Sequence, residues 1–175
     1  MAVQTTAGSS FAISAGAPAT LDAAGYNALT YTVVGEVTDI GEVGREYNLV
    51  NHNPIASRKT QKLKGSYDPG TINLQFGRDF ADAGQTLMRT ASLDDNTYSV
   101  RITLQNGKKL YFRALVTTFK TNLGNVDSIT GGTADLSLME DVLADRLIDA
   151  GCRLSDEVAR QFFVHAEPND SMVSA

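Results

Sequence analysis

The residues that most often carry chemistry in proteins are few in this 175-residue chain and form no recognisable set. The histidines His52 and His165 lie far apart, and the single cysteine, Cys152, has no Cys or His partner at a spacing that binds zinc. Adjacent carboxylates occur at Asp94-Asp95 and Glu140-Asp141, a pattern more typical of solvated turns and helix starts than of acid–base pairs. The sequence predicts no metal site and no catalytic carboxylate pair.

Motifs for an activated nucleophile or a bound phosphate are also absent. The chain contains no G-x-S-x-G, no G-x-x-x-x-G-K-[ST] and no G-x-G-x-x-G. We therefore expect a protein that is not an enzyme and that uses no cofactor. The sequence has no signal peptide and no apolar run near the ~18 residues of a membrane span, so we expect synthesis in a cytoplasm-like compartment and no membrane partner.

Composition favours a mainly β protein of one domain with appendages. Apolar residues make up 42% of the chain, enough for a core, and 15 glycines with only 7% aromatic residues suit a fold with many turns. The net charge is −5: residues 140–175 carry three arginines against eight acids, whereas residues 1–139 carry 12 basic and 12 acidic residues. This acidic balance argues against a tight nucleic-acid binder, which needs a basic surface.

The elements that would position side chains are organised around one predicted helix, Asp79–Ser92. Asp79 is its expected N-cap, and Gly84 weakens the helix by about 1 kcal/mol relative to alanine. The apolar residues at helical spacing, which predict a single buried face, are Phe80, Ala83, Leu87, Met88 and Ala91. The helix should pack on a sheet.

A β-meander follows the helix. Strands are predicted at Tyr98–Gln105 and Lys109–Phe119, joined by the tight-turn signal Asn106-Gly107. A last strand is expected around Ile129–Leu138, with a bulge at Gly131-Gly132. The fold class predicted from these elements is an antiparallel β-sandwich or small barrel with one packed α-helix, plus short C-terminal helices.

Upstream of the helix, two strands and a charged segment are expected. Ala28–Val37 is rich in β-branched residues, and Thr71–Phe76 alternates polar and apolar residues as a half-exposed strand does. Arg45–Ser57 reads as a hairpin or a long exposed loop because Pro54 cannot donate a ladder hydrogen bond. The basic run that follows, Arg58 to Lys64, has three interpretations: a solvated edge, an electrostatic contact with an acidic surface of another subunit, or a phosphate-binding patch.

The two ends of the chain differ in composition from its centre. In residues 1–25, 17 residues are Ala, Gly, Ser or Thr, which predicts either a disordered tail or an arm that becomes ordered against a neighbouring subunit. Apolar spacing predicts one helix from Met139 to Ala150 and a second opening near Leu154. Two short helices would suit a helix-turn-helix DNA reader, but the acidic charge opposes that function. A docking appendage, or a segment packed on the barrel, is the expected alternative.

Several runs of this chain, considered together, resemble a known family. The runs "YTVVGEVTDIGEVG", "GSYDPGTINLQF", "DFADAGQTLMRTA" and "YSVRITLQNGKKLYFRALVTTFKTNLGNVDSITGGTADLSL" resemble the tail tube (major tail) proteins of long non-contractile-tailed bacteriophages, the siphophages. The resemblance is one of pattern and order and covers roughly residues 25–139. It implies an N-terminal arm (1–25), a tail-tube β-barrel domain (26–139) and an acidic C-terminal segment (140–175).

The resemblance implies a structural virion protein that self-assembles into hexameric rings, which stack into a tube for DNA ejection into the host. It implies a place in the virion tail after assembly in the bacterial cytoplasm, with a tape-measure protein, tail-tip and tail-terminator proteins as partners and only transient, non-specific passage of double-stranded DNA. Lumen-facing candidates are Thr71, Asn73, Gln75, Arg101, Thr103 and Gln105. Candidate contacts between subunits or rings are Arg45, Tyr47, Arg58, Lys59, Lys62 and Lys64.

Two other functions remain open at this point. One is another ring-forming protein with the same barrel, such as a tail terminator or a secretion-system inner tube protein. The other is a ligand-binding β-barrel. Tubes of indefinite length, discrete rings or monomers in the electron microscope would separate these three functions.

Overall fold

The computed structural model describes residues 5–144 of the chain. Ten strands and two helices lie within this range. In chain order they are β1 (Ser10–Ser14), α1 (Ala23–Asn27), β2 (Thr32–Val34), β3 (Val37–Asp39), β4 (Glu46–His52), β5 (Gln61–Asp68), β6 (Thr71–Gly77), α2 (Ala83–Ala91), β7 (Tyr98–Thr103), β8 (Lys109–Asn122), β9 (Gly131–Leu138) and β10 (Leu143–Ala144).

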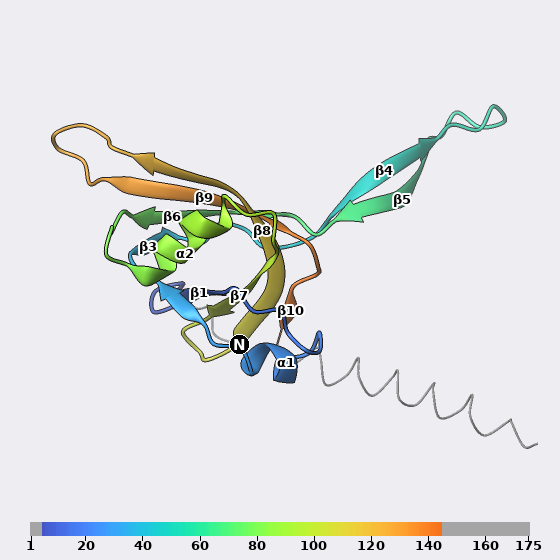
Figure 1. Ribbon diagram of the computed structural model, residues 1–175. Helices are drawn as coiled ribbons and strands as arrows, with labels where there is room; N and C mark the ends of the chain where they lie inside the picture. The colour runs from blue at the N-terminus through green and yellow to red at the C-terminus, as the bar shows by residue number, and fades with distance from the viewer. Residues whose placement is uncertain (1–4, 145–175) are drawn as a thin grey trace, which may run out of the picture.

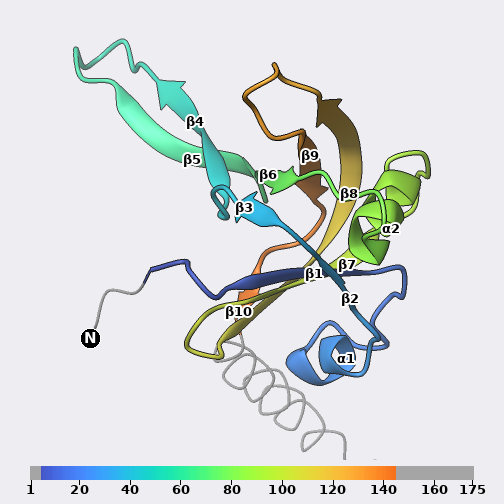
Figure 2. The same ribbon diagram turned by 90° about the vertical axis from the view of Figure 1, so that its left-hand side faces the viewer.

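Eight of these strands form one antiparallel sheet, and β4 and β5 form a separate two-stranded sheet. The order in the large sheet is β2-β1-β7-β8-β9-β6-β3, with β10 beside β8. The long strand β8 joins two halves of this sheet, because its first half pairs with β7 and its second half pairs with β9. Figures 1 and 2 show β8 curving from one half to the other, with α2 lying against the sheet. This is the mainly β, antiparallel fold with few helices that the sequence predicts.

The hydrophobic core lies between the two halves of the sheet and α2. In β6 and β9 every second side chain is buried, the alternation expected of strands with one face in the core. Both halves contribute to one cluster, which includes Phe11, Ile13, Val100, Ile102 and Phe112 from one half and Ile72, Leu74, Phe76 and Leu136 from the other. The predicted turn at Asn106-Gly107 is confirmed: Gly107 has a φ of 80°, and β7 and β8 pair on either side of it.

Helix α2 begins later than expected. Its N-cap is Asp82, whose side chain accepts a hydrogen bond from the Gln85 backbone N–H at 2.6 Å, so the prediction that Asp79 is the N-cap is wrong. Asp79 instead accepts a hydrogen bond from the backbone N–H of Ala81 in the preceding turn. Phe80 therefore precedes the helix and is 73% exposed rather than part of the buried face.

Gly84 is required by packing rather than being a weak point of the helix. An added Cβ at this position would lie 2.7 Å from the Cα of Val34 and closer still to the carbonyl oxygen of Val33. The helix therefore approaches the backbone of β2 so closely that no larger residue fits without movement.

Residues 5–25 do not form a separate arm, which corrects the domain organisation expected from composition. Strand β1 lies inside the sheet between β2 and β7, and Phe11, Ala12 and Ile13 are at most 1% exposed. The Ala/Ser/Gly-rich composition suggested an arm because a five-residue strand in the middle of a sheet needs few large side chains. Pairing on both edges and burial on the core face order this strand within the subunit.

Two backbone irregularities differ from the predicted strand pattern. The strand expected over Ala28–Val37 is divided into β2 and β3 at Glu36, a non-glycine residue with a φ of 56°. The expected bulge at Gly131-Gly132 is wrong, since β9 pairs with β6 in regular register through both glycines. The register shift in this part of the sheet lies between Val116 and Thr118 of β8, which pair with Leu136 and Asp135 rather than with the two glycines. Gly132 instead makes room for Phe76, whose ring would overlap an added Cβ.

The helix expected from Met139 is not formed where the chain is described. Residues 139–142 cross from β9 back toward the start of β8, and Leu143 and Ala144 pair with Tyr111 and Leu110 as β10. The remainder of that predicted helix, the second predicted helix, Cys152 and His165 lie outside the described residues.

Candidate subunit-contact surfaces

Arg45–Ser57, expected as a hairpin or a long exposed loop, forms the first strand and the connecting loop of the β4–β5 hairpin, which extends away from the rest of the molecule. Figure 1 shows β4 and β5 projecting from the sheet with nothing packed against their outer length. Leu49, Val50 and Leu63 are each more than half exposed, and Ile55 in the connecting loop is fully exposed. Leu49 and Val50 are neighbours on a strand, so apolar side chains project from both faces of the hairpin.

Side chains and backbone hold the base of this hairpin to the body. The backbone N–H of Leu138 donates a 2.9 Å hydrogen bond to the Gly70 carbonyl, directly after β5. The guanidinium of Arg45 lies 2.8 Å from the Asp141 carboxylate, which also accepts a 3.3 Å hydrogen bond from the Tyr67 hydroxyl. Arg45 donates a further hydrogen bond to the Tyr47 hydroxyl. Arg45 and Tyr47, both predicted as intermolecular contacts, therefore brace the hairpin within the subunit.

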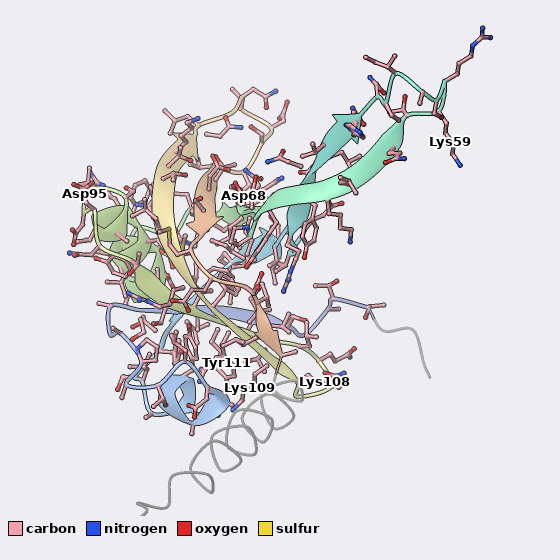
Figure 3. All side chains as sticks on the ribbon, turned by 90° about the vertical axis from the view of Figure 1, so that its right-hand side faces the viewer. Lys59, Asp68, Asp95, Lys108, Lys109 and Tyr111 are labelled. Carbon is pink, nitrogen blue, oxygen red and sulfur yellow. The ribbon has the colours of Figure 1, made fainter. Side chains whose placement is uncertain are left out.

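The other predicted contact residues lie farther along the hairpin. Arg58 and Lys59 belong to the exposed loop between β4 and β5, and Figure 3 shows Lys59 at the far end of the hairpin. Lys62 and Lys64 lie on β5, opposite Asn51 and Leu49. Of the four cations, Lys64 contacts an aromatic ring, with its ammonium 4.5 Å from the centre of the Tyr47 ring. The distal half of the hairpin is thus basic and solvated.

Thr71, Asn73 and Gln75 form an exposed polar row on β6, as the sequence predicts for that strand. Asp135 of the adjacent β9 joins this row, accepting hydrogen bonds from the Asn73 amide at 2.5 Å and the Thr118 hydroxyl at 2.6 Å. These two donors, Thr118 first, hold the pKa of the Asp135 carboxyl below its usual range. This network could not be predicted from the sequence, because the register shift in β8 is what pairs Thr118 with Asp135.

The structure does not bring the predicted β7 residues into the same row. Arg101 lies over the ring of Tyr31, 4.4 Å from its centre, and Thr103 is half-buried, whereas Gln105 is exposed beyond the end of β7. Burial raises the pKa of the Tyr31 hydroxyl to about 12, with Tyr111 adding to the shift and Arg101 opposing it. The segment containing α1 therefore covers this part of the sheet.

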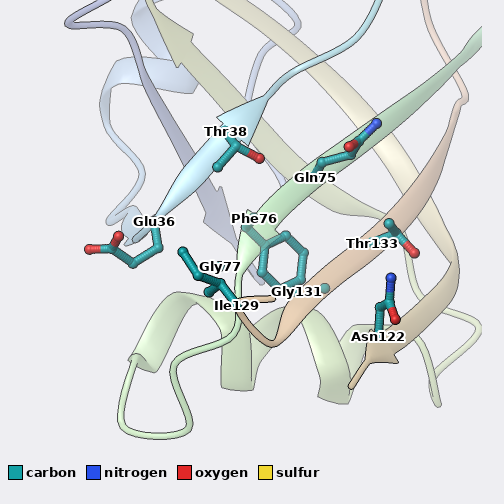
Figure 4. A pocket seen from close by; sticks show the side chains of 10 residues that line it. Glu36, Thr38, Gln75, Phe76, Gly77, Asn122, Ile129, Gly131 and Thr133 are labelled. Carbon is teal, nitrogen blue, oxygen red and sulfur yellow. The ribbon is translucent and has the colours of Figure 1, made fainter. Parts of the chain in front are cut away.

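A pocket of about 310 Å³ opens at the edge of the sheet, between β3, β6 and β9. Figure 4 shows Phe76 at its floor, with Gln75, Thr133 and Asn122 around it and Glu36 at one side. Nothing in this lining matches a nucleophile–base pair. In residues 5–144, no group of three or more His, Cys, Asp or Glu side chains is arranged to hold a metal ion. No helix among these residues is long and apolar enough to cross a membrane.

The fold is shared with chains of several solved tail and injection-system structures. The chain is similar in structure to a chain of the anti-feeding prophage (AFP) baseplate, with 13% identity, a TM-score of 0.61 and coverage of 82% of this chain and 97% of that one. It is similarly close to a chain of the sheath/tube terminator of PVC, an extracellular contractile injection system (10% identity, TM-score 0.60, the same coverage). The SPP1 tail tube follows, with 11% identity, a TM-score of 0.53 and coverage of 78% and 75%.

The sequence identifies the family more narrowly. The family model described as "Phage tail tube protein, TTP" matches residues 1–144, so the chain belongs to this family of structural proteins of the phage tail. No curated protein sequence matches the chain. The match ends where the described structure ends, at β10.

Proposed function

We propose that this protein builds the tube of a long, non-contractile phage tail, with six copies in each ring and rings stacked end to end. The observation that carries the proposal is that the β4–β5 hairpin of this tail-tube-family subunit exposes apolar side chains on both of its faces. An isolated two-stranded hairpin is only marginally stable in water, so a covering partner stabilises it. A second copy of the same chain supplies such a partner. The similar AFP baseplate structure is 6-fold symmetrised, which supports a ring of six.

The polar row of β6 and β9 is our proposed lining of the tube. Thr71, Asn73 and Gln75 carry no positive charge, and Asp135 adds a negative one. Each cation that binds a phosphate gains affinity by releasing counterions, so a lining without cations lets a DNA duplex move. In this proposal Arg101 does not contribute a free cation, because its guanidinium lies over Tyr31.

In this proposal the protein acts by assembly and catalyses no reaction. A tape-measure protein and the tail tip seed the first ring in the host cytoplasm, and a terminator protein stops growth. The chain uses no cofactor for this function.

A tail terminator is the second candidate, favoured by the similarity to the PVC sheath/tube terminator. A terminator forms discrete rings, whereas a tube protein elongates. Electron microscopy of the purified full-length protein, with and without tail-tip seeds, separates the two: we expect tubes of varied length. Discrete rings would support the terminator, and a protein that stays monomeric with seeds present would contradict both.

The hairpin's part in assembly is tested by removing its exposed apolar side chains. Changing Leu49, Val50 and Leu63 to serine should leave the melting temperature within a few degrees, because these side chains are exposed, but should abolish tubes. Leu93→Ser, at a residue 85% exposed after α2, is the control and should assemble normally. Normal tubes from the triple variant would remove the hairpin from the assembly mechanism.

A further inference from the structure

The β4–β5 hairpin carries opposite charges at its two ends. Lys59 lies in the loop at the distal end and Lys62 lies next to it on β5, whereas Glu46 and Asp68 lie where the hairpin meets the body. Figure 3 shows Lys59 and Asp68 at these two ends.

The two acids at the base face each other across the strands. Glu46 and Asp68 are direct partners in the antiparallel register, so their side chains lie on the same face. Both are exposed, and among the described residues neither forms an ion pair, since the base cation Arg45 is paired with Asp141. Like charges at directly opposed positions destabilise a sheet. A cation that binds between these two carboxylates would relieve their repulsion.

This acidic face is separate from the basic and aromatic face of the same hairpin. Side chains alternate along a strand, so Glu46 and Asp68 project away from the face that carries Tyr47 and Tyr67. Lys64 lies over the Tyr47 ring on that other face. The acidic pair therefore presents its charge to solvent without a neighbouring cation.

The hairpin cannot neutralise its own charges. Lys62 and Asp68 lie near opposite ends of β5, about 20 Å apart at the usual rise of a strand, and Lys59 is farther along. At physiological ionic strength exposed charges are largely screened beyond ~8 Å. The two ends of the hairpin are therefore free to pair with other surfaces.

We propose that the basic distal end of one hairpin binds the Glu46–Asp68 face at the base of the hairpin of a second copy. This inference rests on the proposed tube function and names the receiving surface for the contact. One patch of each copy meets a different patch of the next, a head-to-tail contact. Such contacts repeat without closing on themselves unless the rotation completes a ring, so they suit growth of a stack. Opposite charges also steer each arriving subunit into register.

This contact is tested by reversing the charge of the basic distal end, of the acidic face, and of both in one chain. Lys59→Glu with Lys62→Glu reverses the basic end. Glu46→Lys with Asp68→Asn reverses the acidic face while keeping a side-chain oxygen for the hydrogen bond that Asp68 accepts from the Gly70 N–H. We expect each reversal alone to slow tube elongation, followed by light scattering, about tenfold, since like charges then face each other at the contact. The two reversals combined in one chain should restore elongation.

The matched control places the same charge change elsewhere. Asp95→Lys with Asp127→Asn makes the same charge change at two exposed acids outside the hairpin, and Figure 3 shows Asp95 on the far side of the body. This pair should not rescue the Lys59→Glu, Lys62→Glu chain. Rescue by the control, or no rescue by the Glu46 and Asp68 changes, would overturn the inference. Circular dichroism of every variant establishes that it is folded.

A cross-linking measurement separates this contact from the tube function. Chains with Cys152→Ser and a single cysteine at Lys59→Cys are mixed with equivalent chains carrying Glu46→Cys, and a short bismaleimide is added. We expect a mixed cross-linked dimer that 0.5 M salt suppresses, ~0.5 M being well above the ionic strength that screens exposed charges. Wild-type tubes without this cross-link would overturn the inference and leave the proposed function standing. The cross-link without wild-type tubes would support the contact and count against the tube.

Discussion

Gln85 connects α2 to the sheet through both ends of its amide. The residue is fully buried; its oxygen accepts hydrogen bonds from Arg78 at 2.8 Å and the Asp79 backbone N–H at 3.0 Å. Its amide nitrogen donates to the carbonyls of Gly35 at 3.2 Å and Gly77 at 2.9 Å. A single side chain thereby joins the helix, the turn before it, the end of β6 and the break between β2 and β3 at Glu36, here called the β2–β3 kink. Its position beside Met88 and Ala91 on the buried face gives no sign of this role in the sequence.

Gln85→Leu should therefore destabilise the subunit strongly although the two side chains are similar in volume. Each buried partner left without a hydrogen bond costs about 1–3 kcal/mol. Urea unfolding followed by circular dichroism measures the loss. The control is Gln75→Leu on the exposed face of β6, expected to change the free energy of unfolding by no more than about 0.5 kcal/mol. Equal stabilities of the two variants would contradict the role of Gln85.

At the scale of elements, α2 is shaped by what it packs against more than by its own helix propensity. Asp82 caps the helix and its second carboxylate oxygen accepts a 3.2 Å hydrogen bond from the Gly35 N–H, so one residue both starts the helix and ties it to the β2–β3 kink. Gly84 permits the close approach to β2 that brings these groups together. Helix and kink are thus mutually dependent.

Gly84→Ala distinguishes packing from propensity because the two effects have opposite signs. In an exposed helix this change gains about 1 kcal/mol. Here the added methyl group would meet the backbone of Val33 and Val34, and overpacking of this kind costs about 1–3 kcal/mol. We expect a lower thermal midpoint, measured by calorimetry. The control is the exposed Thr90→Ala in the same helix, which should raise the midpoint slightly because alanine is the better helix former. A stabilised Gly84→Ala protein would show that the helix can move outward freely.

On the scale of the whole molecule, the subunit divides into a well-packed body and a projecting hairpin. The body includes the N-terminal strand β1, whose Phe11 and Ile13 belong to the core and whose two edges pair with β2 and β7. The hairpin has no core of its own, and the Arg45–Asp141 pair and the Gly70 backbone contact hold its base. Folding and assembly therefore depend on different parts of the chain.

Removal of the first 14 residues should prevent folding rather than assembly alone. The deletion removes β1 and exposes the facing edges of β2 and β7, and burial of Phe or Ile side chains contributes about 1.5–3 kcal/mol each. Since domains are stable by only about 5–15 kcal/mol, we expect loss of the cooperative thermal transition. Removal of residues 1–7, which precede β1, is the matched control and should leave a folded subunit. A folded, assembly-deficient protein lacking residues 1–14 would instead support an arm.

Local patterns in the sequence were enough to predict the separate elements and the class of protein. Alternation in Thr71–Phe76 and Tyr98–Gln105 placed two strands and their buried faces, Asn106-Gly107 placed a turn, and Pro54 with the basic run indicated an exposed hairpin. These features are readable because side-chain period and turn geometry depend on residues close together in the chain. The order of the same runs indicated the tail tube family.

Which segments belong to the body, and what role single residues such as Gly84 have, depends on contacts between segments that are distant in the sequence. β1 looks disordered by composition, Gly84 looks like a helix defect, and Glu46 and Asp68 lie far apart in the sequence, yet each acquires its role from a partner strand. The bulge that aims Thr118 at Asp135 belongs to β8 rather than to the Gly131-Gly132 pair that suggested it. Pairing register and close backbone approach are properties of two distant segments at once, so no local pattern encodes them.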